Sequence, residues 1–301
     1  MTPSELNRQF AIANALRFET APGGLTRAVI STPLADAEIF QQGAHIAHWV
    51  VPGRKPVLFM SSKSFLAPGK PIRGGVPIIF PWFGPRSGDK PGPAHGFART
   101  ALWSVESARV LNSGAVEIAF SLAADQASRA LGFDDFAVRF TATIGSELSM
   151  SLDVSNRSHA PFVFEEALHT YFAVSSVRDI AIHGLEGTTY IDKTDAFSRK
   201  VQPDAPIRIG KETDQVHLDS TAACVIADPP RDRRIVISKT GSNSTVVWNP
   251  WIAKAAALGD MSPDEWPAMI CVETANVAGN AVTLAAGDSH SMTTTITLVS
   301  N

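Results

Sequence analysis

The sequence predicts an all-β fold made of large antiparallel twisted sheets, with few short helices. Segments in which apolar and polar residues alternate recur along the 301-residue chain, and such alternation places one strand face on a core and the other toward water. Turn residues separate these segments, and strands do not alternate with helices. The 20 prolines and 21 glycines therefore favour a large sandwich of sheets over a parallel α/β fold.

The strand pattern is clearest in four segments, residues 116–120, 136–143, 148–154 and 291–298. Turn-forming residues at 111–114 and 144–146 separate strand-like stretches, which predicts hairpin connections. Residues 228–234 are rich in proline and arginine, but strand-like residues flank them closely on both sides. We interpret this stretch as a hairpin loop rather than a linker between domains.

Helical signals are confined to two places. Residues 4–15 are expected to form a first helix with Ser4 as its N-cap, and residues 263–266 a single turn after Ser262. No internal repeat, low-complexity tract or clear linker divides the chain. We therefore expect one domain spanning residues 1–301.

Charge and composition restrict the partners and the compartment. The formal net charge is -3 and the pI is near 6.2, so we expect no nucleic-acid or membrane partner. The first residues do not resemble a secretory signal, and no stretch approaches the ~20 apolar residues of a membrane span, which predicts a cytosolic protein. Cys224 and Cys271 lack metal-site spacing and are interpreted as small core residues.

Residues 69–99 are predicted to form an ordered loop, because proline and glycine interrupt any regular strand there. Arg73 precedes two glycines that allow close approach of a ligand, and His95 and Arg99 lie four residues apart across a third glycine. Either arginine alone would be interpreted as a surface ion-pair partner. Together, in a stretch with so little charge, they favour binding of an anion or of hydroxyl groups.

Polar residues also interrupt the β-prone segment 162–174, at Glu165, Glu166 and His169. A single histidine in such a segment is commonly a hydrogen-bonded core residue. The neighbouring glutamates change this interpretation, because a nearby carboxylate favours the imidazolium form. His169 is therefore expected to be protonated near neutral pH and to act as a proton donor.

Glu273 follows the wholly apolar residues 269–272 on a predicted strand. A carboxylate in such surroundings is either paired with a cation for structural reasons or is a general base whose pKa is raised by desolvation. The sequence alone leaves both interpretations open.

Two weaker patterns involve histidine and tryptophan. His45 and His48 lie three apart in a strand-like segment, so we interpret them as ordinary strand residues rather than metal ligands. Trp248 and Trp251 flank a turn and suit stacking on a sugar as well as core packing. Nucleotide-binding loops and the nucleophile elbow of hydrolases are absent from the sequence.

The motifs occur in the order seen in a known enzyme family. They are residues 72–77 (IRGGVP), 80–84 (FPWFG), 95–99 (HGFAR), 168–172 (LHTYF), 190–193 (YIDK), 213–214 (TD) and 271–273 (CVE). Over about residues 25–298 the chain resembles the glucose-6-phosphate 1-epimerases, the hexose-6-phosphate mutarotase branch of the aldose 1-epimerase superfamily. The resemblance implies a galactose mutarotase-like β-supersandwich that interconverts the α and β anomers of a hexose 6-phosphate without a metal or organic cofactor. We expect the protein to be a monomer.

The same resemblance implies roles for six residues. Glu273 corresponds to the general base and His169 to the general acid of ring opening. The substrate-binding residues are Arg73, His95, Arg99 and Asp214. His95 orients substrate oxygens, Asp214 holds a hydroxyl group, and the two arginines hold the sugar and its phosphate.

The chain departs from the family pattern at three positions near these motifs. Ala94 stands where glutamine is common, which removes one substrate contact. Gln215 and His217 stand where arginine and tyrosine are usual, which is expected to remove a positive charge near the site. These departures concern the identity of the substrate, including its 6-phosphate, more than the type of reaction.

Three other functions compete with the hexose-phosphate mutarotase. The first is a mutarotase of unphosphorylated hexoses, and the second is a carbohydrate-binding module without catalysis. The third is a metal-dependent sugar isomerase that uses His45, His48 and a carboxylate, and the sequence favours it least.

Overall fold

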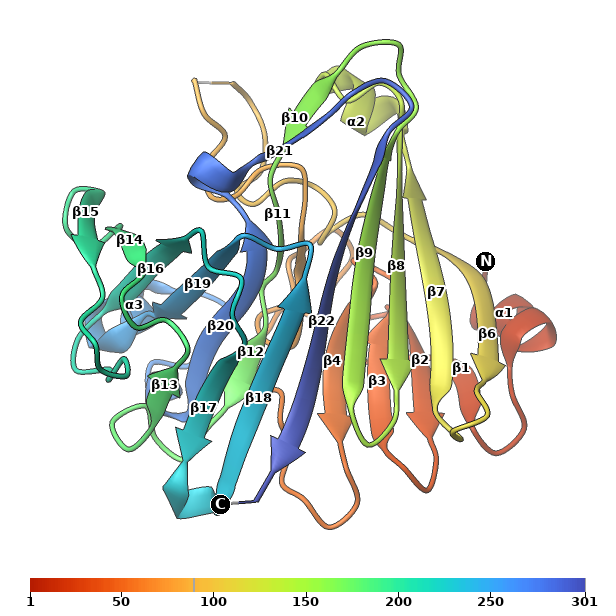
Figure 1. The fold of residues 1–301 in the computed structure, drawn as a ribbon. Helices are drawn as coiled ribbons and strands as arrows, with labels where there is room; N and C mark the ends of the chain where they lie inside the picture. Colours follow the sequence, from red (N-terminus) through yellow and green to blue (C-terminus); the bar gives the residue numbers. More distant parts are fainter. Residues whose placement is uncertain (89, 301) are drawn as a thin grey trace.

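A computed structural model describes residues 1–88 and 90–300. In these residues two eight-stranded sheets are accompanied by a four-stranded sheet and a two-stranded ribbon. The paired strands run antiparallel throughout, and Figure 1 shows how the sheets are arranged. The predicted all-β class is confirmed. Among the described residues, none of the helices has the length and apolar character needed to span a membrane.

The four-stranded sheet follows the first helix, α1 (Pro3–Phe10), and consists of β1 (Leu16–Thr20), β2 (Thr26–Ser31), β3 (Asp36–Phe40) and β4 (His45–Val50). The expected helix over residues 4–15 is too long and has the wrong cap. Thr2 is the N-cap, because its hydroxyl accepts from the Glu5 N–H while the Glu5 carboxylate accepts from the Thr2 N–H. The helix ends early because Ile12 pairs with Leu16 across a turn.

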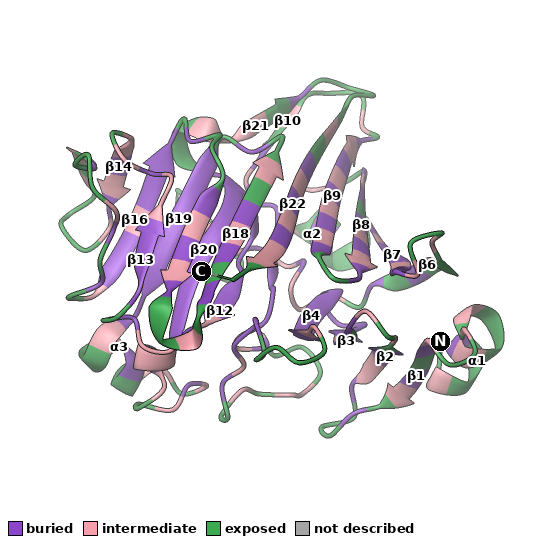
Figure 2. Cartoon of the chain, turned by 60° about the horizontal axis from the view of Figure 1, so that its bottom comes forward, coloured by how far each residue is buried: buried purple, intermediate pink, exposed green. Residues whose placement is uncertain are grey.

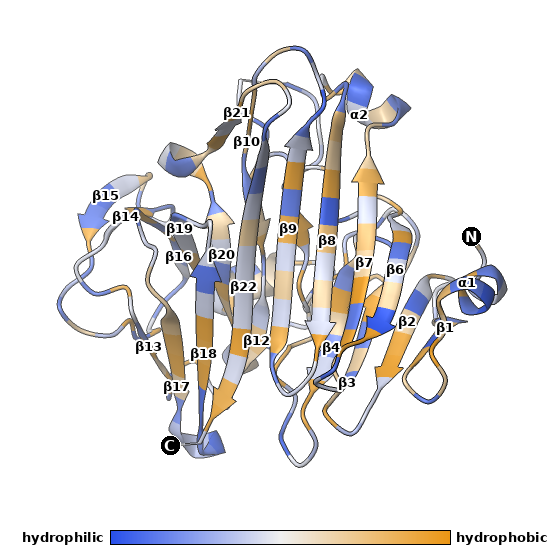
Figure 3. Ribbon diagram, turned by 45° about the vertical axis from the view of Figure 1, so that its right-hand side comes forward, coloured by the Kyte–Doolittle hydropathy of each residue, from blue (hydrophilic) through white to orange (hydrophobic). Residues whose placement is uncertain are grey.

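The first eight-stranded sheet carries the four predicted segments in its centre. Its strands, in spatial order, are β13 (Ala181–His183), β17 (Cys224–Asp228), β18 (Arg233–Thr240), β22 (Ser289–Val299), β9 (Leu148–Asn156), β8 (Phe136–Ile144), β7 (Val116–Ala123) and β6 (Ser104–Val110). Buried residues alternate strictly with partly exposed ones along β9. Figure 3 shows the same banding of apolar and polar residues on β7, β8 and β9. The period-two prediction is therefore confirmed there.

The second eight-stranded sheet is buried far more completely. Its strands are β15 (Ser198–Val201), β14 (Thr189–Asp192), β16 (Thr213–Leu218), β19 (Ser244–Asn249), β20 (Met269–Asn276), β11 (Glu166–Leu168) and β5 (Ile78–Ile79), with β12 (Tyr171–Ala173) paired to the other half of β20. Every residue of β19 and β20 is buried, as Figure 2 shows in purple. Both faces of these two strands are therefore covered by protein.

The remaining elements are short. They are β10 (Phe162–Phe164), β21 (Val282–Leu284), α2 (Gln126–Ala130), α3 (Trp251–Ala257) and the 3₁₀ turns η1 (Pro229–Arg231), η2 (Trp266–Ala268) and η3 (Ala278–Asn280). The predicted hairpin loop over 228–234 is confirmed, with η1 at its tip. The predicted turn after Ser262 is also present, since the Glu265 N–H donates to the Ser262 carbonyl at 3.1 Å.

Among its described residues, the predicted ordered loop over 69–99 contains the two-residue β5 as its only named strand. Phe80 anchors it in the core, packing against Phe97, Phe136 and other rings at centroid distances of 5.4–6.0 Å. Gly75 lies directly on β4, where a Cβ atom would come within 2.2 Å of the Ile46 carbonyl oxygen. At Gly75 and Phe80, therefore, the loop is held against β4 and the core.

We predict that the core tolerates truncation of a central aromatic side chain poorly. Phe140 on β8 is fully buried, so Phe140→Ala should lower the free energy of unfolding by about 3–5 kcal/mol. Val163 is 58% exposed, and Val163→Ala should change it by less than about 0.5 kcal/mol. Urea denaturation of both variants provides the measurement, and equal effects at the two positions would contradict the assignment of the core.

Candidate active site

A cavity of about 300 Å³ lies over the second eight-stranded sheet. The loop over residues 69–99, β16, β19, β20 and α3 all contribute to its lining. The structure brings together every site residue expected from the sequence, since the lining includes Arg73, His95, Arg99, His169, Asp214 and Glu273. A volume of this size is at the lower end of the range for small-molecule sites.

Strand register explains why these residues converge. Glu273 on β20 lies opposite Val246 on β19, and Asp214 on β16 lies opposite Trp248 on the same β19. Because cross-strand partners share a face, and residues two apart on one strand do so too, Glu273, Asp214 and Trp248 point to the same side of the sheet. His169 follows β11, whose Leu168 pairs with Thr274 next to Glu273.

The imidazole and the carboxyl group form a close pair. His169 Nε2 lies 3.3 Å from Glu273 Oε1, and both side chains are almost completely buried. Burial raises the pKa of Glu273 well above its ordinary value and lowers the pKa of His169 well below its own. Both shifts disfavour the charged forms of the two groups in the free site. Acid–base chemistry needs the pair to hold one proton, with Glu273 as the carboxylate and His169 as the imidazolium.

The expectation that Glu165 and Glu166 keep His169 protonated is wrong. Glu165 accepts hydrogen bonds from the Phe83 and Ala278 N–H groups, both at 2.7 Å. Glu166 is held elsewhere, and neither glutamate contributes to the pKa shift of His169. Neighbouring residues of a strand point to opposite faces. Glu165 and Glu166 therefore do not surround His169, although they lie close to it in the sequence.

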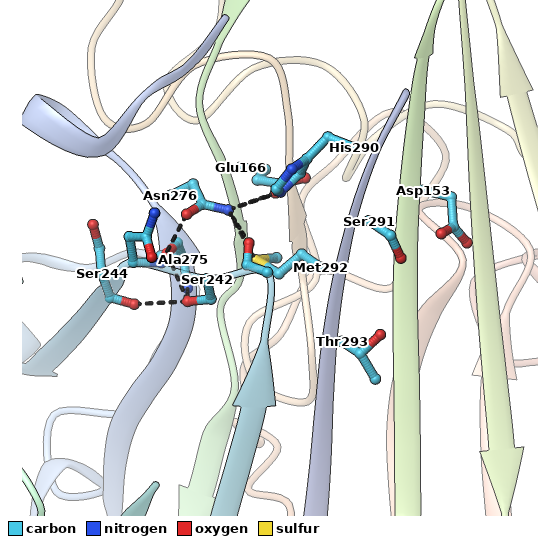
Figure 4. Close-up of polar contacts among 12 residues, drawn as sticks. Asp153, Glu166, Ser242, Ser244, Ala275, Asn276, His290, Ser291, Met292 and Thr293 are labelled. Carbon is cyan, nitrogen blue, oxygen red and sulfur yellow. Dashed lines mark hydrogen bonds and ion pairs between the residues drawn. The ribbon is translucent and has the colours of Figure 1, made fainter. Parts of the chain in front are cut away.

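Glu166 belongs to a separate polar network between the two large sheets, drawn in Figure 4. Its Oε1 lies 3.0 Å from His290 Nε2 on β22 and accepts from Asn276 Nδ2 at 2.8 Å. The carboxylate raises the pKa of His290, whereas burial raises the pKa of Glu166 itself. This network links β11 to β20 and β22.

Arg73 is held rigidly at the cavity wall. Its Nε and Nη2 donate to the Asp260 carboxylate, both at 3.1 Å, and its Nη1 donates to the Tyr171 hydroxyl at 2.9 Å. Arg99 differs, because its Nη2 donates to the Ala94 carbonyl at 2.7 Å and the described residues give it no carboxylate partner. Arg99 thus has more capacity left for a ligand.

His95 is a neutral imidazole. Burial lowers its pKa to about 3, and the positive charge of the neighbouring Arg99 contributes to this shift. Its Nδ1 accepts a hydrogen bond from the Gly84 N–H at 3.3 Å, which assigns the ring proton to Nε2. The residue adopts φ 65°, a left-handed conformation that is uncommon outside glycine and that sets the direction of the ring.

Asp214 lies between two lysines that sequence reasoning did not assign. Lys193 Nζ is 3.4 Å from Oδ1 and Lys254 Nζ is 3.9 Å from Oδ2, and both lysines line the cavity. Lys193 belongs to one of the family motifs, which could have identified it. Lys254 on α3 has no local pattern to identify it, and the same holds for Asp260.

The expected loss of a positive charge at position 215 does not affect the cavity. Gln215 and His217 alternate with Asp214 on β16 and point to the opposite face of the sheet. His217 Nδ1 there contacts the Thr188 hydroxyl at 2.7 Å, and burial lowers its pKa to about 4. Lys193 and Lys254 supply positive charge on the cavity side.

His45 and His48 are strand residues of β4 and do not form a ligand cluster. Within the part of the chain that the structure describes, the metal-ligand group with atoms close together is His169, Cys271 and Glu273. Trp248 lines the cavity, while Trp251 packs against Trp266 with ring centroids 4.2 Å apart. Both cysteines are free and buried, as predicted.

The buried imidazole–carboxyl pair in a polar cavity offers an acid and a base of the kind that opening a sugar hemiacetal requires. The aldose 1-epimerase family model matches residues 27–297, and the chain belongs to this family. It is therefore an isomerase of the epimerase type, and the mutarotase-like fold inferred from the resemblance is confirmed.

Similar proteins agree with this assignment. A protein of Escherichia coli K12 named "Putative glucose-6-phosphate 1-epimerase" is 33% identical over 82% of each chain. A protein of Cenchrus ciliaris with the same name is 32% identical over 89% of this chain and 83% of its own. The crystal structure of a "putative mutarotase" from Salmonella typhimurium superposes with a TM-score of 0.89 at 29% identity, covering 97% of this chain and 96% of that one.

We predict a pH-dependent contribution of His290 to stability. Because its folded pKa is raised, the His290–Glu166 pair stabilises the protein below the unfolded histidine pKa of about 6.5, and this is lost as pH rises through the folded value. The difference in free energy of unfolding between wild type and His290→Gln should therefore be larger at about pH 6 than at about pH 9. Urea denaturation at both pH values measures it, with the exposed His159→Gln as a control expected to show no such trend.

Proposed function

We propose that the chain interconverts the α and β anomers of a hexose 6-phosphate, with glucose 6-phosphate as the preferred substrate. The observation that carries this proposal is the pair of His169 and Glu273, 3.3 Å apart, inside a cavity with an excess of cationic side chains. The names of the relatives in E. coli and Cenchrus ciliaris support the same substrate. A single domain, acting as a cytosolic monomer, stays a prediction.

The reaction requires one base and one acid. Ionised Glu273 removes the proton from the C1 hydroxyl, the C1–O5 bond breaks as the C1 carbonyl forms, and protonated His169 gives its proton to O5. Rotation about C1–C2 presents the other carbonyl face, and the steps reverse. Positioned proton transfer of this kind contributes about 10² to 10⁴ in rate. The pair ends each cycle with the one proton that it held at the start.

The raised pKa of Glu273 suits this role. A base is most effective when its pKa lies close to the working pH, and burial shifts the carboxyl group in that direction. Neutral His95 offers an Nε2 proton to a substrate oxygen, and Asp214 can accept from a sugar hydroxyl. These contacts would orient the ring so that C1 and O5 lie between Glu273 and His169.

The cationic lining supports a phosphorylated substrate. Four cationic side chains line the cavity, Arg73, Arg99, Lys193 and Lys254, against the two carboxyl groups of Asp214 and Glu273. The four cations outnumber the two carboxyl groups, so the cavity attracts anions. Among the arginines, Arg99 is the better phosphate ligand because Asp260 already occupies two donors of Arg73.

A mutarotase of unphosphorylated hexoses is the second candidate. The pairing of Arg73 with Asp260 and of both lysines with Asp214 favours it, since each pairing offsets part of the positive charge. A binding module without catalysis is disfavoured, because a carboxyl group buried beside an imidazole costs stability and is suited to proton transfer.

We predict that Glu273→Gln loses at least about 10²-fold in the rate of catalysed anomer exchange, because the amide cannot accept the C1 proton. NMR exchange spectroscopy on the anomeric protons of glucose 6-phosphate measures the rate. His169→Asn should show a comparable loss. Thermal unfolding provides the control for folding, and a folded Glu273→Gln with wild-type rates would remove Glu273 from the mechanism.

We predict that Arg99→Ala raises KM for glucose 6-phosphate by roughly tenfold to a hundredfold, because a charge-assisted hydrogen bond to phosphate is lost. The turnover number should change much less, and glucose kinetics should stay as in wild type. An equal effect of the substitution on both sugars would contradict phosphate binding at this position and favour the second candidate.

A further inference from the structure

The third buried side chain beside the acid–base pair is a thiol that the mutarotase reaction does not use. Cys271 lies two residues before Glu273 on β20 and therefore points to the same face of the sheet. Its Sγ, a ring nitrogen of His169 and a carboxylate oxygen of Glu273 lie within 4.8 Å of one another. All three residues are buried, and Cys271 is not among the residues that line the cavity.

These three groups form an incomplete coordination set. Both oxygens of Glu273 and the Nδ1 of His169 are buried and lack a hydrogen-bond partner among the described residues. Buried polar atoms of this kind are rare in folded proteins. Substrate hydroxyls would satisfy some of them during catalysis, but in the free protein they form a ready set of electron-pair donors.

Ligand chemistry and spacing fit a thiophilic divalent ion. Thiolate, imidazole and carboxylate are the side chains that bind Zn²⁺, with bonds of about 2.0–2.3 Å in tetrahedral geometry. Such bonds give ligand-to-ligand distances of roughly 3.3–3.8 Å, and the distance from His169 Nε2 to Glu273 Oε1 is already 3.3 Å. Mg²⁺ and Ca²⁺ prefer oxygen ligands and do not suit this set.

We propose that His169, Cys271 and Glu273 form an inhibitory binding site for zinc-like metal ions. The ion binds the lone pairs through which Glu273 and His169 take up protons, so its binding stops anomer exchange. His169 and Glu273 line the cavity, so the ion would lie where the substrate binds. The inhibitory effect, but not the binding, rests on the proposed function.

Two features of the site set the strength of binding. Burial raises the pKa of the Cys271 thiol well above its ordinary value, so a metal ion must displace the thiol proton, which the strength of the metal–sulfur bond allows. Arg73, Arg99 and Lys193 repel a divalent cation and attract a phosphorylated sugar. Metal and substrate are therefore expected to compete for the cavity.

The test compares two buried cysteines. Zn²⁺ should inhibit anomer exchange by the wild type, EDTA should reverse the inhibition, and Mg²⁺ should have no effect. Cys271→Ser should keep the exchange rate while its inhibition constant for Zn²⁺ rises by at least about tenfold. The matched control is Cys224→Ser, because Cys224 is buried on β17 in the other large sheet and its loss should leave zinc sensitivity unchanged.

A second measurement reports binding without activity. Co²⁺ bound to a thiolate gives a sulfur-to-metal charge-transfer absorption, which should appear in the wild type and in Cys224→Ser and disappear in Cys271→Ser. If Cys271→Ser does not fold, Cys271→Ala replaces it, with thermal unfolding as the check. A cobalt signal that depends on Cys271 in a protein without mutarotase activity would support the site and refute the proposed function. Zinc inhibition and cobalt absorption that are both independent of Cys271 would overturn the site.

Discussion

The burial of a carboxyl group on a central strand is the constraint on which the rest of this structure depends. Glu273 lies on β20, whose residues are buried on both faces, and such a group is costly without a polar neighbour. His169 is that neighbour, and it reaches Glu273 only because β11 pairs with β20 in one register. A slip of one residue would turn Glu273 to the opposite face.

The charges around the cavity are arranged in partly compensated groups. Asp260 and Tyr171 fix the guanidinium of Arg73, and two lysines flank Asp214. Each group is therefore held in place before a ligand arrives, so little reorganisation is needed when charge and hydrogen bonds change during a reaction. The excess of cations remains available for an anionic substituent far from the reacting carbon.

The sequence was sufficient to predict four neighbouring strands of the first large sheet, β22, β9, β8 and β7, and six residues of the cavity lining. Alternation gave the strands, and Glu273 and Arg73 could be recognised because they interrupt an apolar or a glycine-rich stretch. The alternation of β16 could also have shown that Gln215 faces away from Asp214. That conclusion needed only the strand period.

Properties that depend on contacts between distant segments could not be predicted. The protonation of His169 was inferred from its sequence neighbours Glu165 and Glu166, but these bind other parts of the chain. Burial instead lowers the pKa of the imidazole well below its ordinary value. Asp260 and Lys254 carry no local pattern, and their importance follows only from long-range packing. The first helix was overextended because the pairing of Ile12 with Leu16 is a tertiary constraint on its end.

The contact between Gly75 and β4 gives the four-stranded sheet an indirect part in recognition. None of its residues lines the cavity, yet the Ile46 carbonyl accepts from the Val76 N–H at 2.9 Å, and the Gly75 backbone lies against the same strand. The arginine two positions earlier is thus oriented by a sheet outside the site. Substitutions in that sheet would therefore change the affinity for the sugar before they change the chemistry at the anomeric carbon.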